Sequence, residues 1–136
     1  MENILIDAGP IIALFNKRDA YHQKAVDFIK TNPYRYYSTW PVITESSHML
    51  DFSVKAQLNL LKWIDRGGVH LVEFSKDSLP RLIQLSEKFS DVPMDLVDAS
   101  LILASEKLNI LAVMSIDGDF YIYRNIRNQY LQNHFL

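Results

Sequence analysis

The chain contains no cysteine, which excludes disulfide bonds, thiolate metal sites and cysteine nucleophiles. It also lacks an excess of positive charge, because 14 basic and 16 acidic residues give a formal net charge of -2. With a pI of about 6.0, the surface as a whole is not the basic field that drives nonspecific binding to nucleic acid. Any nucleic acid must therefore be held by a local feature of the protein.

The sequence also lacks the signals of a membrane or exported protein. No apolar stretch reaches the roughly 18 residues that are needed to cross a bilayer. The N-terminus shows no basic segment followed by a cleavable apolar core. We therefore expect a cytoplasmic protein without a membrane partner.

What the chain does contain is enough apolar material for one domain, since 49% of its 136 residues are hydrophobic. Strand-like segments alternate with helix-like segments, which predicts an α/β fold with a mainly parallel central sheet. We expect a single domain over residues 1–136, in which the polar and aromatic tail from Asn125 onward carries no clear structural signal.

Apolar patterns, prolines and glycines predict where the elements lie. The expected strands are 4–6, 36–39, 69–73 and 111–115, with a further candidate at 120–123. The expected helices are 10–16, a helix capped by Asp19 that runs to about Thr31, 41–52, 54–65, 75–90 and 96–108.

Four acidic residues stand where these strands end or where the following helices begin: Asp7, Glu45, Asp98 and Asp117. In open α/β sheets, the carboxyl ends of the strands and the first turns of the following helices share one crevice, where ligands bind. We therefore expect the four carboxylates to meet at one edge of the sheet. Asp95 precedes Asp98 by three residues and can cap the same helix.

Converging carboxylates oppose folding unless a cation compensates them. Two like charges 4 Å apart repel each other by about 4 kcal/mol at an effective dielectric constant near 20. A set of oxygen ligands favours the hard ions Mg²⁺ or Mn²⁺, whereas zinc more often recruits histidine or cysteine. Such ions activate water and stabilise the charge that develops on a phosphate during hydrolysis. The pattern therefore indicates metal-dependent nuclease chemistry.

The segments that carry these acids resemble PIN domains, and most closely the VapC-type ribonuclease toxins of bacterial and archaeal toxin-antitoxin pairs. They are ILIDAGPIIALFN, TESSHML, PMDLVDASLILASEKL and SIDGDF, and they span roughly residues 4–123. The resemblance implies a three-layer sandwich of helices around a parallel sheet, and an endoribonuclease that hydrolyses RNA with Mg²⁺ or Mn²⁺. It also implies inhibition by a cognate antitoxin and frequent homodimerisation.

The resemblance assigns catalytic and metal-binding roles to all four acids. Asp7, Glu45 and Asp98 are the ligands we expect first. The fourth acid is Asp117 or its neighbour Asp119, and it could act through water.

Two further residues are expected to support these acids. Ser115 matches the small hydroxyl residue near the fourth acid, where it could donate a hydrogen bond to a carboxylate. Asp95 shares a helix face with Asp98 and is better explained as a cap than as a ligand.

Other functions remain open from the sequence. A catalytically inactive PIN-like protein could bind RNA or a protein, although such a module has no reason to keep mutually repelling carboxylates. A receiver-like domain that accepts a phosphoryl group also uses acids and Mg²⁺, but Asp7 has no adjacent acidic partner. Each acid taken alone is also compatible with a turn or a helix cap.

Two short segments could contact single-stranded RNA through cations and aromatic rings. Lys17 and Arg18 follow the first helix, and residues 34–37 (YRYY) lead into the second strand. A solvated loop and aromatic packing explain the two segments equally well. The apolar stripe of Leu58, Leu61 and Ile64 is expected to face the core, with an interface as the alternative.

Overall fold

The computed structural model describes residues 1–92, 94–117, 120 and 123–136. Its centre is a five-stranded sheet in the order β3-β2-β1-β4-β5, and every neighbouring pair of strands is parallel. The strands are β1 (Asn3–Ile6), β2 (Arg35–Thr39), β3 (His70–Val72), β4 (Ala112–Met114) and β5 (Gln132–Asn133). The predicted α/β class with a parallel sheet is confirmed.

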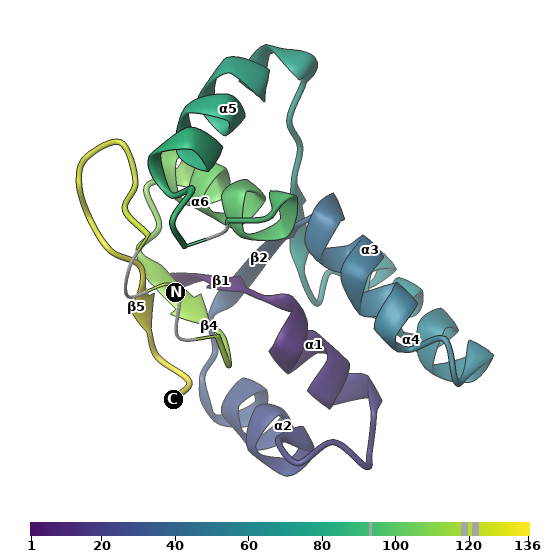
Figure 1. Ribbon diagram of the computed structural model, residues 1–136. Coiled ribbons are helices and arrows are strands. Elements are labelled where there is room, and N and C mark those ends of the chain that lie inside the picture. The colour runs from purple at the N-terminus through teal and green to yellow at the C-terminus, as the bar shows by residue number, and fades with distance from the viewer. Residues whose placement is uncertain (93, 118–119, 121–122) are drawn as a thin grey trace.

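Helices flank this sheet on both sides. They are α1 (Ala8–Phe15), α2 (His22–Thr31), α3 (Trp40–Met49), α4 (Val54–Asp65), α5 (Leu79–Lys88) and α6 (Leu96–Leu108). Helices α5 and α6 lie on one side of the strands and α1 and α2 on the other, while α3 and α4 extend outward beside α1 (Figure 1). This is the three-layer arrangement that the sequence predicted.

Strand β1 occupies the middle of the sheet and is buried on both faces. Ile4, Leu5 and Ile6 are each 0% exposed, which explains why the strand is a continuous apolar run and shows no alternation. The chain leaves β1 toward β2 and later returns to β1's other side as β4. A change of direction of this kind opens a crevice at the carboxyl ends of β1 and β4.

Several boundaries differ from the expectation. Asp19 does not cap α2, because the helix begins three residues later at His22 and the Asp19 side chain accepts the N–H of Tyr21 at 2.8 Å. The expected helix 75–90 is divided into a short 3₁₀ turn, η1 (Lys76–Ser78), and α5. Pro80 lies in the first turn of α5, where it suits the start of a new helix.

The C-terminal tail is more ordered than its sequence indicated. It contributes β5, which pairs with β4, and Arg124 forms an isolated bridge with Tyr130. The candidate strand 120–123 lies partly outside the described residues, and its described ends, Phe120 and Tyr123, belong to no strand. Among the helices of the described residues, none has the length and apolar character of a membrane span.

Candidate metal centre

Asp7 lies at the junction of β1 and α1 and is only 6% exposed. Its backbone N–H donates to the carbonyl of Met114 on β4 at 3.0 Å, so the junction is held against the neighbouring strand. One carboxylate oxygen accepts the N–H of Ala8 at 2.8 Å and caps α1. The other oxygen, Oδ2, accepts the hydroxyl of Ser115 at 3.0 Å. Asp7 is therefore both a cap and a carboxylate fixed at the crevice.

Asp98 enters the same crevice from the first turn of α6 and is 8% exposed. The side chain of Asp95 accepts the N–H of Asp98 at 2.8 Å, so Asp95 is the cap of α6. The hydroxyl of Tyr123, itself fully buried, donates to Oδ2 of Asp98 at 3.5 Å. The Asp95 cap therefore holds the backbone of Asp98, and the Tyr123 contact limits how its carboxylate can turn.

Asp117 follows β4 and is partly buried. Its N–H donates to the hydroxyl oxygen of Ser115 at 2.9 Å, and the same hydroxyl donates to Asp7. Ser115 is completely buried, and its carbonyl accepts the side-chain amide of Asn133 on β5 at 2.9 Å. One serine hydroxyl thus links the two acids, and β5 holds that serine in place.

Three of the expected acids converge in the structure. Asp7, Asp98 and Asp117 each offer a carboxylate oxygen, and these oxygens all lie within 4.8 Å of one another. They line a cleft of about 380 Å³ that also includes Glu45 and Asp95. In the part of the chain that the structure describes, no basic side chain lines this cleft.

Glu45 lines the cleft but lies outside the group of three. Its position on α3 leaves the residue exposed, whereas Asp7 and Asp98 are buried. The sequence placed Glu45 ahead of Asp117 among the expected ligands, whereas the group of three contains Asp117 and not Glu45. Asp119, the alternative fourth acid, lies outside the described residues.

The electrostatics of the cleft favour protonation of Asp7 and Glu45. Burial raises the pKa of Asp7 to about 6, with smaller increases from the charges of Asp117 and Glu45, while the hydrogen bonds from Ala8 and Ser115 act in the opposite direction. The pKa of Glu45 is also raised, by burial first and then by the charges of Asp95 and Asp117. These two raised pKa values show that ionised Asp7 and Glu45 are unfavourable in the cleft without a compensating positive charge.

The donor set fits a hard divalent cation. It consists of carboxylate oxygens close enough to share one ion, and it includes neither sulfur nor imidazole. Asp7 and Asp98 are buried, and their carboxylates accept hydrogen bonds from Ser115 and Tyr123, so a cation would find these two ligands already oriented.

Gly9 determines how closely α1 approaches the segment that carries Asp117. A Cβ atom on Gly9 would lie 3.1 Å from Cδ1 of Ile116, the residue that precedes Asp117. Because this distance is tighter than an ordinary contact, a Cβ atom at this position would require the Ile116 side chain to move by a few tenths of an ångström.

Sequence reasoning missed two residues that support the acids. Tyr123 contacts Asp98 across 25 positions, and Asn133 contacts Ser115 across 18. Tyr123 ends the candidate strand 120–123 and Asn133 lies in the tail, and no local pattern in the sequence connected either residue with the acids.

The profile of the PIN domain family matches residues 4–125. The fold is similar to that of VapC20 of Mycobacterium tuberculosis, whose structure is described as that of a sarcin-ricin loop cleaving toxin. The superposition has a TM-score of 0.78 and 20% sequence identity, and covers 88% of this chain and 94% of that one. No curated protein matches the chain. Because the family profile extends over almost all of the sequence, the chain belongs to the PIN domain family.

Proposed function

We propose that this PIN domain is a metal-dependent endoribonuclease that hydrolyses phosphodiester bonds of RNA. The observation that carries the proposal is the convergence of Asp7, Asp98 and Asp117, whose carboxylate oxygens lie within 4.8 Å of one another. The likeness to a toxin that cleaves the sarcin-ricin loop supports RNA as the substrate class. We further propose that the protein is the toxin of a type II toxin-antitoxin pair.

Asp7, Asp98 and Asp117 are the proposed metal ligands and catalytic acids. Ser115 is a positioning residue, because its hydroxyl orients the Asp7 carboxylate and fixes the backbone of Asp117. Glu45 completes the proposed set of catalytic and metal-binding acids, because it lines the same cleft and the charge of Asp117 contributes to its raised pKa. No side-chain nucleophile is required.

The proposed cofactor is Mg²⁺ or Mn²⁺, which the three carboxylates would hold. When bound, such an ion activates water and stabilises the charge that develops on the phosphate. The protein would hold the carboxylate ligands of the ion rigidly, in a cleft whose negative charge otherwise repels a polyanion. Asp95 supports this by capping α6, and Asp119 is a further proposed supporting acid.

A cognate antitoxin and a second copy of the chain are the proposed protein partners, in the cytoplasm. Large apolar side chains that would benefit from a partner are exposed on several helices: Trp40, Leu58, Leu61, Leu79 and Leu96. The expectation that the stripe on α4 faces the core is wrong for Leu58 and Leu61, which are about half exposed, whereas Ile64 packs against the core.

The test is incubation of the purified protein with structured and unstructured RNAs in Mn²⁺ or in EDTA, with the products resolved on a denaturing gel. We expect cleavage by the wild type in Mn²⁺ alone, and none by Asp7→Asn. Equal cleavage by Asp7→Asn, or cleavage that persists in EDTA, would refute the assignment.

A further inference from the structure

The acidic cleft cannot by itself attract RNA. Its described lining contains acids and apolar residues but no cation, and the chain has a net charge of -2. Binding of single strands depends on a positively charged groove that follows the backbone and on aromatic rings on which bases stack. A nuclease with this cleft therefore needs cations close by.

A second cavity, of about 600 Å³, adjoins the acidic cleft along α1. Ile12 lines the acidic cleft and Phe15 lines the second cavity, and residues three apart are neighbours on one helix face. On the opposite wall, Met49 at the end of α3 lines the first cavity, and Phe52, three residues later in the following loop, lines the second. Helix α1 spans about 12 Å at 1.5 Å per residue, so the two cavities are within reach of one short RNA segment.

Two cations, Lys17 and Arg18, line the second cavity. Both residues are exposed. Among the described residues, the ion pair is between Arg81 and Glu106, so neither Lys17 nor Arg18 is engaged in one. The turn that carries them is ordered by the Asn16 side chain, which accepts the N–H of Arg18 at 3.1 Å. The two positive charges are thus presented on a fixed turn and remain available to a ligand.

An aromatic ring stands on the other wall of this cavity. Phe52 is 62% exposed and lies in the loop between α3 and α4. Phe15 lies opposite and is held by an edge-on contact with Trp63, with ring centroids 5.6 Å apart. An exposed ring next to two cations is the combination that binds a base and its phosphates.

We propose that Lys17, Arg18 and Phe52 form a subsite for single-stranded RNA next to the acidic cleft. The cations contact phosphates that flank the cleaved bond, and Phe52 stacks on a base. This inference rests on the proposed nuclease function, because it assigns the substrate of the same site.

The matched control is Arg35, an exposed arginine in the segment 34–37 that the sequence offered as a second candidate for RNA contact. The structure places it at the opposite end of the strands from the acids, and it lines neither cavity. It lies at the amino end of β2, whereas the acids lie at the carboxyl ends of the parallel strands. Its side chain donates to the carbonyl of Met1 at 3.3 Å. Replacing it removes one positive charge without touching the proposed subsite.

The experiment measures the binding of a fluorescein-labelled single-stranded RNA by fluorescence anisotropy, in EDTA and over a series of salt concentrations. The double substitution of Lys17→Gln and Arg18→Gln should lower the dependence of log K on log salt by about 1.4, since each phosphate contact contributes about 0.7 for single strands. Phe52→Ala should weaken binding about tenfold without changing that slope. Arg35→Gln should bind as the wild type does.

Two results would overturn the subsite: a double variant with the wild-type slope and affinity, or a wild type that does not bind the RNA at low salt. In the first case, the cations would instead be available to an acidic protein partner. Cleavage in Mn²⁺ is scored separately, so the outcomes remain distinct. If the wild type cleaves RNA but the double variant binds RNA as the wild type does, the subsite alone is disproved. If the double variant shows the expected decrease in slope but the wild type does not cleave RNA, the nuclease function is disproved and the subsite remains.

Discussion

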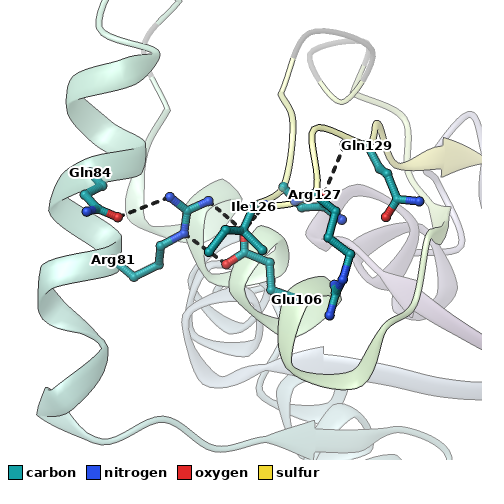
Figure 2. Close-up of polar contacts among 7 residues, drawn as sticks. Arg81, Gln84, Glu106, Ile126, Arg127 and Gln129 are labelled. Carbon is teal, nitrogen blue, oxygen red and sulfur yellow. Dashed lines mark hydrogen bonds and ion pairs between the residues drawn. The ribbon is translucent and has the colours of Figure 1, made fainter.

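Two regions of the molecule hold carboxylates away from water, and they compensate the charge in opposite ways. Between α5 and α6, Glu106 accepts hydrogen bonds from Nε and Nη2 of Arg81 at 3.0 and 2.7 Å, and from the N–H of Ile126 at 2.7 Å (Figure 2). At the carboxyl edge of the sheet, Asp7 and Asp98 face other acids, and no cation lines the described part of the cleft.

Glu106 is a structural carboxylate, whereas the acids of the cleft do not stabilise the fold in this way. The Glu106 side chain is 11% exposed, yet its charge is satisfied within the protein, and its third hydrogen bond ties the C-terminal segment to α6. The acids of the cleft also receive hydrogen bonds, but burial first, and then the charges of Asp117 and Glu45, raise the pKa of Asp7. Removing a charge should therefore have opposite effects on stability in the two regions.

The largest expected effect is on activity, from Asp98→Asn. The substitution removes a proposed ligand, and we expect cleavage of RNA in Mn²⁺ to fall by more than about 100-fold, because even outer-shell partners of a metal are worth 10–100-fold. Without divalent metal, the variant should be as stable as the wild type or more stable, because it removes one repelling charge. Urea unfolding in EDTA measures this. A marked loss of stability would instead make Asp98 a structural carboxylate.

The second effect is a pH dependence that originates at Asp7. Its pKa in the native state is raised to about 6, so between roughly pH 4 and 6 the native state binds more protons at this group than the unfolded state does. The contribution of this proton binding to the free energy of unfolding is therefore fully present below pH 4 and is lost as the pH rises to 6. A shift of about two pKa units corresponds to on the order of 3 kcal/mol.

Urea unfolding of Asp7→Asn and the wild type in EDTA checks this dependence. At pH 7.5 the variant should be more stable than the wild type, and near pH 3.5 the difference should nearly vanish. A difference that is independent of pH would show that the effect comes from packing and not from ionisation.

The third effect has the opposite sign and comes from Glu106→Gln. The substitution leaves Arg81 without its ion pair and weakens the bond to Ile126, so we expect a loss of about 2 kcal/mol in the free energy of unfolding. Glu87→Gln on α5 is the matched control, because Glu87 is exposed and should change stability by less than about 0.5 kcal/mol. Cleavage by the folded Glu106 variant should remain at the wild-type level. Loss of cleavage without loss of stability would contradict the structural role.

Much of this contrast was accessible from the sequence, because local patterns determine where the acids enter the fold. The run Ile4 to Ile6 is a buried strand, and Asp7 lies at its carboxyl end as expected. The ranges predicted for α4 and α6 agree with the structure residue by residue. In α6, a capping acid and a long apolar run act together, so propensity and burial favour the same bounds.

The remainder depends on contacts between distant parts of the chain. Glu45 and Asp117 both reach the cleft, but Asp117 joins the group of three because Ser115 holds its backbone beside Asp7. Asn133 in turn holds Ser115 from a two-residue strand whose sequence carries no alternating pattern. The pairing of Glu106 with Arg81 across 25 positions was equally invisible to local patterns.

The smallest expected effect is the shift in Tm on addition of Mn²⁺, which can be compared between variants of the two regions. Binding of Mn²⁺ to the native state alone should stabilise the wild type by about 1.4 kcal/mol at ten times the dissociation constant, a rise of roughly 3–5 °C in Tm for a domain of this size. The Glu106→Gln variant should begin from a lower Tm and show the same rise, because its ligands are intact. Asp98→Asn should show a smaller rise or none. If Mn²⁺ shifted Asp98→Asn as much as the wild type, the cation would bind elsewhere on the chain, and the acids of the cleft would lose their proposed role.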